Sequence, residues 1–308
     1  MSARGSALTR SVAGTTMTGA DASDVAARGV GRSPRWRTVG RSAGTSGATA
    51  TTATSTDASG GVATEGGRAS GAAGAFNHYY ERDVDQLMRR TRERPFASGA
   101  LKPSRWWLVG FLTLLAASLA LAALTAGHVA AGYVFLGAFT YGIVYTVWLK
   151  RRSTWNIVVG GLAGSFAVLA GAAAVDPSPQ IVPTVLAVVL FLWTPPHFWS
   201  LAAAKGEDYA RARIPMLPVV APAYAWTSAV LAHAVALAVV SLVPLWFGAG
   251  TLYGICAAVG GCYFVWKSIL LHRDPSKANA MGNFFASLLQ LALLVLGALL
   301  SSAAGMLS

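Results

Sequence analysis

The chain has 308 residues, of which 54% are hydrophobic and only 12% are charged, and its mean hydropathy is +0.51. These values exclude an ordinary soluble domain and indicate an integral membrane protein, whose surroundings are the lipid bilayer. The formal net charge of +12 would suit a nucleic-acid-binding protein, but the basic residues concentrate in alternate connections between apolar segments, so we expect no nucleic-acid partner.

The first seventy residues differ in composition from the rest of the chain. They are rich in Ala, Gly, Ser, Thr and Arg, and Trp36 is their only aromatic residue. Such a segment cannot offset its ordering entropy, so we predict disorder over residues 1–70 and a membrane domain over residues 71–308. An organellar transit peptide, or a coding segment altered by a wrong start or a frame error, are alternatives. The small-residue tract 71–76 has the character of the end of a membrane helix whose beginning is absent.

Acidic and basic side chains cluster in residues 77–95, next to the apolar segments. Asn77, Glu81 and Asp85 follow one another at a spacing of four, so on a helix they form one slowly drifting stripe. Converging oxygen ligands of this kind suit Mg²⁺, which prefers one or two carboxylates together with phosphate oxygens. The alternative is a solvated helix end in which Asp85 pairs with Arg89.

Seven apolar segments are long enough to cross a hydrocarbon layer of ~30 Å. Lys and Arg precede the first segment and follow the second, fourth and sixth, whereas the intervening connections carry none. The positive-inside rule therefore places the basic connections in the cytoplasm and the C-terminus outside. The segments cover residues 105–125, 130–149, 156–175, 181–204, 225–247, 250–270 and 283–303.

The second apolar segment ends in an aromatic and basic run that includes Tyr145, Lys150 and Arg151. One interpretation is an aromatic belt with basic topology anchors, which many membrane helices carry. The other is that Lys150 and Arg151 point at phosphates held by the first motif, where cations would neutralise a departing diphosphate.

The fourth apolar segment contains Pro195 and Pro196, directly followed by His197. A proline pair frees backbone carbonyls, which is tolerated mainly where the helix is buried in protein or lines a cavity. A histidine inside a membrane is a functional candidate, although a hydrogen-bonded structural histidine is the alternative. If the helix continues, His197 and Asp208 lie on one face about three turns apart. Asp208 could equally form a solvated ion pair with Lys205.

Together these tracts resemble the UbiA superfamily of intramembrane aromatic prenyltransferases, and within it the branch that farnesylates haem. The resemblance extends from residue 71 to the C-terminus, and the run 194–199 favours the haem branch over enzymes that prenylate quinone or chlorophyll precursors. It is specific in residues 77–95, 145–156, 193–199 and 208–220.

The resemblance implies an all-α bundle of nine membrane helices around a central cavity. It implies a cytoplasmic site in which Mg²⁺ bridges farnesyl diphosphate to acidic motifs, with haem B as the second substrate. His197 is then the candidate contact for the haem iron or a propionate, and Glu81 stands where Asp is more usual. The implied catalytic residues are Asn77, Glu81, Asp85, Lys150, Arg151 and Asp208; the metal ligands are Glu81, Asp83, Asp85 and Asp208; the substrate-binding residues are Arg89, Arg94, Tyr145, His197 and Lys205.

The implied reaction ionises the allylic diphosphate, and a haem vinyl group then attacks the farnesyl cation. The implied location is the inner cell membrane, or the mitochondrial inner membrane in a eukaryote, with haem A synthase or oxidase assembly as a further partner. Residues 1–70 supply neither the first family helix nor most of the second, so we expect impaired or absent activity. Another UbiA-type prenyltransferase, an inactive truncated homologue and a membrane transporter are the alternatives.

Overall fold

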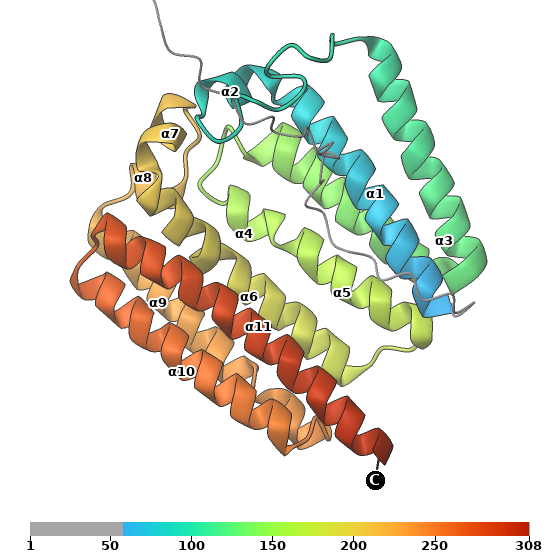
Figure 1. Ribbon diagram of the computed structural model, residues 1–308, viewed down its shortest axis with the longest axis vertical. Coiled ribbons are helices and arrows are strands. Elements are labelled where there is room, and N and C mark those ends of the chain that lie inside the picture. The colour runs from blue at the N-terminus through green and yellow to red at the C-terminus, as the bar shows by residue number, and fades with distance from the viewer. Residues whose placement is uncertain (1–57, 308) are drawn as a thin grey trace, which may run out of the picture. The chain divides into compact units, whose positions relative to one another are not determined.

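The structure, a computed structural model, describes residues 58–307 and the side chains of residues 64–304. Every regular element in this part of the chain is a helix, which confirms the all-α class (Figure 1). The elements are α1 (Ala58–Tyr80), α2 (Arg82–Leu87), α3 (Arg105–Phe139), η1 (Thr140–Leu149), α4 (Asn156–Gly160), α5 (Leu162–Val175), α6 (Ile181–Ala204), α7 (Gly206–Arg211), α8 (Leu217–Val220), α9 (Ala223–Val240), η2 (Val243–Phe247), α10 (Thr251–Arg273) and α11 (Lys277–Leu307).

Within the described residues, six helical stretches are long and apolar enough to cross a membrane. The first, Arg105–Leu149, covers two of the seven expected segments and is interrupted at Gly127, whose φ of 88° is readily adopted only by glycine. The ring of Phe111 contacts Tyr79, and Thr146 contacts Asn77, so both ends of this stretch lie at the same end of α1. The chain therefore reverses at Gly127, and the stretch makes two crossings.

α1 differs from the prediction, because residues 58–70 were expected to be disordered and are helical. Its small side chains allow close packing against α3 and α5, and Ala69, Ala72 and Ala73 are buried there. Close approach of helices through Gly and Ala is a main source of stability in membranes, and composition alone underestimated it. The disorder expected for residues 1–57 lies outside the described residues.

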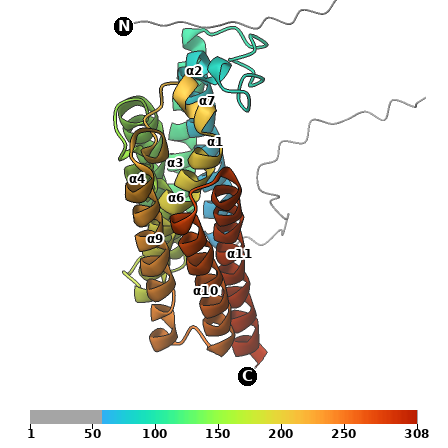
Figure 2. The same cartoon turned by 90° about the vertical axis from the view of Figure 1, so that its left-hand side faces the viewer.

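The C-terminal helices pack through the same kind of contact. α11 lies beside α10 (Figure 2) and also contacts α6. A Cβ added to Gly297 would lie 2.8 Å from Cβ of Cys256, so glycine is required for the two backbones to approach this closely. A buried cluster that includes Trp193, Leu237 and Phe264 joins α6, α9, α10 and α11.

α6 continues through Pro195 and Pro196 and ends at Ala204. The backbone of Lys205 is not helical (φ −115°, ψ 27°), and α7 starts as a separate helix. His197 and Asp208 therefore do not lie on one continuous helix, and the spacing argument that placed them on a shared face does not apply.

Candidate active site

The first acidic motif lies where α1 meets α2. Glu81 interrupts the helix with φ −96° and ψ 12°, but its N–H still bonds to the carbonyl of Asn77, and the N–H of Asp85 bonds to the carbonyl of Glu81. This backbone pattern preserves the spacing of four across the interruption. The side chains of Asn77, Glu81 and Asp85 are all buried.

Glu81 is the centre of this group. Its Oε2 accepts a hydrogen bond from Nδ2 of Asn77 at 2.8 Å and forms an ion pair with Nζ of Lys150. Nδ2 of Asn77 also donates to Oγ1 of Thr146 at 3.1 Å. Oε1 of Glu81 is buried and has no hydrogen-bond partner among the described residues. The carboxylate is thus held by one oxygen and keeps the other available.

Lys150 reaches Glu81 from the end of η1, a π-helical segment. Its N–H bonds to the carbonyl of Tyr145, five residues earlier, at 2.9 Å, and its Nζ lies 5.5 Å from the centre of the Tyr145 ring. Segments of π-helix are frequent at functional sites because they reorient side chains. Gly160 makes room for this ring, since a Cβ there would lie 2.8 Å from Cδ2 of Tyr145.

Asp85 pairs with Arg94, whose Nη1 lies 3.0 and 2.9 Å from the two carboxylate oxygens. Oγ1 of Thr91 donates to the backbone carbonyl of Asp85, which folds the following loop back onto the helix. The alternative ion pair between Asp85 and Arg89 is therefore wrong. Arg89 is exposed, and the structure does not bring it into the cluster.

Asp83 and Arg151 form a second ion pair at the rim of this group. Two hydrogen bonds of 2.8 and 2.7 Å join them, and the guanidinium also lies over the ring of Tyr80. The hydrogen bond from Arg151 lowers the pKa of Asp83, and Asp83 raises the pKa of Arg151. Asp83 is exposed, which separates it from the three buried residues of the motif.

The second acidic region lies on α7. Oδ1 of Asp208 is 3.3 Å from Nη1 of Arg211, and Arg211 also donates to the carbonyl of Leu87 in α2 at 3.4 Å. The α7 region thus contacts the end of the first motif. The alternative ion pair between Asp208 and Lys205 is wrong, because Arg211 takes that place and Lys205 is exposed.

His197 is buried between α6 and α11, apart from the charged group. Its Nδ1 lies 2.8 Å from Oγ of Ser287, and its ring stacks on Trp193 and Phe284. Sequence reasoning missed Ser287 and its neighbour Asn283, which bonds to Ser200. Their spacing of four on an apolar helix was the available signal, because it places both on one face.

The charged group offers a magnesium ion carboxylate oxygens but no complete set of protein ligands. Among the described residues, no group of three His, Cys, Asp or Glu side chains could hold a metal ion. Mg²⁺, however, needs only one or two carboxylates when phosphate oxygens complete its coordination. The unpartnered Oε1 of Glu81 is a donor of this kind, so the residues present fit a metal shared with a phosphate-bearing ligand.

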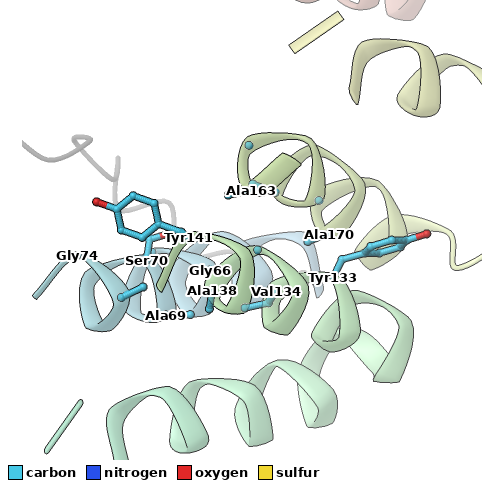
Figure 3. A pocket seen from close by; sticks show the side chains of 16 residues that line it. Gly66, Ala69, Ser70, Gly74, Tyr133, Val134, Ala138, Tyr141, Ala163 and Ala170 are labelled. Carbon is cyan, nitrogen blue, oxygen red and sulfur yellow. The ribbon is translucent and has the colours of Figure 1, made fainter. Parts of the chain in front are cut away.

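A pocket of about 640 Å³ is lined by α1, α3, η1 and α5 (Figure 3). One end of its lining lies close in the chain to the charged group. Gly74 precedes Asn77 by three residues, and Tyr141 accepts a hydrogen bond from Thr146, the partner of Asn77. Small and aromatic side chains line the pocket, and sequence analysis did not single them out. They include Gly66, Ala69, Ser70 and Gly74 of α1, Tyr133, Val134 and Ala138 of α3, Tyr141 of η1, and Ala163 and Ala170 of α5.

Several known proteins are similar in sequence to this chain. Protoheme IX farnesyltransferase 2 of Paramagnetospirillum magneticum is 59% identical over 224 residues, which are 73% of this chain and 78% of that protein. Protoheme IX farnesyltransferase 1 of the same organism is 49% identical and covers 73% and 80% of the two chains. The protoheme IX farnesyltransferase of Neorickettsia sennetsu is 43% identical and covers 77% and 80%.

Two solved structures share the fold. A digeranylgeranylglyceryl phosphate synthase aligns with a TM-score of 0.62 at 14% identity, covering 79% of this chain and 84% of that one. A UbiA homologue from Aeropyrum pernix aligns with a TM-score of 0.58 at 18% identity, covering 79% and 90%. The UbiA prenyltransferase family matches residues 47–289. This chain, with its acidic motif facing basic side chains at the end of a membrane helix bundle, belongs to the UbiA prenyltransferase family.

Proposed function

We infer that this chain is a protoheme IX farnesyltransferase, which transfers farnesyl from farnesyl diphosphate to a vinyl group of haem B. The products are haem O and diphosphate. The observation that carries the inference is the 59% identity to a farnesyltransferase of this kind over 73% of the chain. The pairing of each acid of the first motif with a lysine or arginine agrees with it, because both kinds of group are needed at a diphosphate.

The basic side chains bind the diphosphate in this proposal. Lys150 and Arg151 approach the motif from η1, and Arg94 approaches from the loop after α2. As the allylic bond breaks, negative charge develops on the leaving oxygen, and cations fixed nearby stabilise that charge. When the diphosphate binds, each cation would exchange its carboxylate partner for a phosphate oxygen.

Oε1 of Glu81 and the carboxylate of Asp85 would hold Mg²⁺, with Asp83 and Asp208 at the rim of the site. The ion, when bound, neutralises charge on the diphosphate. Glu81 is the first choice among the four because its Oε1 has no partner among the described residues. The amide of Asn77 orients the carboxylate of Glu81 by donating to Oε2.

The pocket between α1, α3 and α5 would receive the isoprenoid chain. The lining residues Gly66 and Gly74 are eight positions apart on α1, which corresponds to about 12 Å along the helix axis. The walls are mostly Ala, Gly, Val and Tyr, with Ser70 as the one aliphatic hydroxyl among them. A lining of this kind would shield the farnesyl cation until the vinyl group attacks. Water then adds to the resulting cation and completes the hydroxyethylfarnesyl side chain.

We place the site on the cytoplasmic side of the inner cell membrane, or of the mitochondrial inner membrane in a eukaryote. The basic connections near the charged group support this orientation. His197 would contact haem B, and Arg89 and Lys205 would attract the diphosphate from the exposed rim. Haem A synthase or an oxidase assembly factor is the partner that would receive the product.

The proposal is tested by incubating membranes containing the full chain with haem B, farnesyl diphosphate and Mg²⁺, followed by mass analysis. We expect haem O to form, and to be absent with the double variant Glu81→Gln, Asp85→Asn. From the sequence, impaired or absent activity was expected, because residues 1–70 supply neither the first family helix nor most of the second. α1 supplies helix in part of that stretch. Product formation would therefore contradict the expected loss of activity. Prenylation of a quinone precursor without haem O would instead indicate another UbiA-type prenyltransferase, and substrate uptake into vesicles without any prenyl product would indicate a transporter.

A further inference from the structure

Thr146 is a fully buried residue of η1 whose side chain joins two elements of the charged group. Its Oγ1 donates to the carbonyl of Tyr141, five residues earlier, at 2.8 Å, and accepts from Nδ2 of Asn77 on α1 at 3.1 Å. In an α-helix, a threonine hydroxyl makes the corresponding bond to a carbonyl three or four residues earlier. The π-helical backbone therefore sets the direction in which this hydroxyl points.

The single hydroxyl proton of Thr146 determines which end of the Asn77 amide faces it. A threonine hydroxyl has one proton to donate, whereas a backbone carbonyl only accepts. The proton lies on the bond to Tyr141, so Oγ1 must accept from Asn77, and the amide presents its NH2 group. The charge of Glu81 imposes the same orientation, because an amide oxygen in the place of Nδ2, 2.8 Å from Oε2, would repel the carboxylate.

Both N–H groups of Asn77 are used in this arrangement. One donates to Oε2 of Glu81 and the other to Oγ1 of Thr146. Oε2 also pairs with Nζ of Lys150, so two donors hold the same carboxylate oxygen. Oε1 is buried without a hydrogen-bond partner among the described residues, and it is the oxygen left for a metal ion. The orientation of this oxygen thus depends on Thr146, which does not touch Glu81's free oxygen itself.

We propose that Thr146 is a positioning residue of the diphosphate site, which fixes the amide of Asn77 and through it the carboxylate of Glu81. This inference rests on the proposed function, because it takes Oε1 of Glu81 as a ligand of Mg²⁺. It also gives a reason for the amide at position 77. A carboxylate there would offer only acceptors, both to the charged Glu81 and to a hydroxyl whose proton is already used at Tyr141.

The first test measures metal binding without the reaction. Purified full chain in detergent is titrated with Mn²⁺ in the presence of inorganic diphosphate, and bound Mn²⁺ is followed by electron paramagnetic resonance. Mn²⁺ replaces Mg²⁺ here because both ions prefer carboxylate and water oxygens. Loss of an outer partner of a metal ligand typically weakens metal binding by about 10–100-fold. Thr146→Val acts through a further side chain, so we expect the lower end, about tenfold.

Two further variants show whether the hydroxyl is the cause. Thr146→Ser keeps the hydroxyl without the methyl group, and it should bind Mn²⁺ nearly as wild type does. Thr184→Val is the matched control on α6, because Oγ1 of Thr184 donates to the carbonyl of Gln180 at 2.7 Å and lies outside the charged group. That variant should keep the wild-type affinity. Should Thr146→Val not fold, Thr146→Ala provides the same comparison.

A double variant tests whether Thr146 acts through Asn77. If it does, Thr146→Val added to Asn77→Ala should weaken Mn²⁺ binding no further than Asn77→Ala alone, because the two residues belong to one chain of contacts. Haem O formation gives a second readout. Thr146→Val should raise the Mg²⁺ concentration for half-maximal rate about tenfold, while the rate at saturating Mg²⁺ stays within a few-fold of wild type. A merely structural role would lower the thermal midpoint and the maximal rate with unchanged Mn²⁺ affinity.

The proposal fails if Thr146→Val binds Mn²⁺ as wild type does, if Thr146→Ser is as weak as Thr146→Val, or if the two effects add in the double variant. A wild-type chain that binds no Mn²⁺ with diphosphate also overturns it. Haem O formation by wild-type membranes is measured in parallel. Product from wild type with unchanged Mn²⁺ affinity in Thr146→Val overturns this inference alone, whereas absence of product from wild type overturns the proposed function.

Discussion

Among the described residues, two of the buried polar regions are built in opposite ways. The region at the junction of α1, α2 and η1 uses full charges, with Glu81 against Lys150 and Asp85 against Arg94. The region between α6, α10 and α11 uses neutral hydrogen bonds, such as Asn283 to Ser200. The difference indicates separate tasks: charged pairs can exchange partners with a charged ligand, whereas neutral bonds hold helices in place.

The energetics of the two regions support this division. A buried ion pair gains little over an apolar replacement, so its presence is poorly explained by stability alone. Hydrogen bonds between membrane helices contribute about 0.6 kcal/mol each on average, and they leave no uncompensated charge in lipid. The charged region is therefore the one whose disruption should have the larger consequences.

The largest effect is expected for Lys150→Met. The side chain of Glu81 is only 1% exposed, and removing its cation would leave a buried negative charge without compensation. Loss of one partner of such a pair costs about 3–5 kcal/mol. We expect a marked fall in the thermal midpoint in detergent and no haem O.

The double variant Lys150→Met, Glu81→Gln separates stability from activity. It removes both charges, so the thermal midpoint should return toward that of wild type while haem O formation stays absent. Recovery of activity as well would show that the charges at this position serve folding only, and the contrast between the two regions would be lost.

The next effect is expected for Asp85→Asn. The amide keeps the shape of the side chain and can still accept from Arg94, but it lacks the charge that Mg²⁺ requires. Loss of one charge-stabilising group typically lowers kcat by about 10²–10³-fold. The fall in kcat is measured as the rate of haem O formation at several Mg²⁺ concentrations. If the variant had wild-type activity at every concentration, Asp85 would not belong to the metal site.

A smaller effect is expected for Asn283→Ala in the neutral region. Asn283 is fully buried, donates to Ser200 and accepts from Ser268. Loss of these bonds should cost about 1–2 kcal/mol, near the upper end for membrane helices. The thermal midpoint should fall while haem O formation at low temperature stays within a few-fold of wild type. Complete loss of activity in a folded variant would show that this region also takes part in catalysis.

The sequence predicted the membrane segments well because bilayer thickness sets their length, and hydropathy reports it directly. It also predicted the helical spacing of Asn77, Glu81 and Asp85, which the backbone hydrogen bonds keep across the interruption at Glu81. It did not predict that Asp85 pairs with Arg94, because the conformation of the loop after α2 determines which arginine reaches the Asp85 carboxylate. Local spacing favoured Arg89, and tertiary structure overrode it.

The helix at residues 58–70 was missed for a related reason. Gly and Ala have little value when counted as hydrophobic surface, and their contribution appears only when a neighbouring helix approaches closely. Ser287 was missed because its spacing of four from Asn283 places both on one face of a helix but does not say which helix that face contacts. Its role depends on His197, which lies 90 residues earlier in the chain.

The smallest effect is expected at the exposed rim, for the pair of Asp83 and Arg151. The hydrogen bond from Arg151 lowers the pKa of Asp83 below its ordinary value of about 3.9. The stabilisation by this pair is therefore fully present above that ordinary value and is lost only as pH falls through the lowered pKa. Asp83→Asn should change the free energy of unfolding by less than about 1 kcal/mol, because water screens exposed pairs.

Thermal unfolding of wild type and Asp83→Asn between pH 5 and pH 8 measures the contribution of the rim pair to the free energy of unfolding. The difference between them should be small and constant across the range, since Asp83 stays ionised throughout it. A difference that grows toward pH 5 would mean that the pKa of Asp83 is raised instead of lowered. The position of a charge relative to water would then no longer explain which ion pairs matter most.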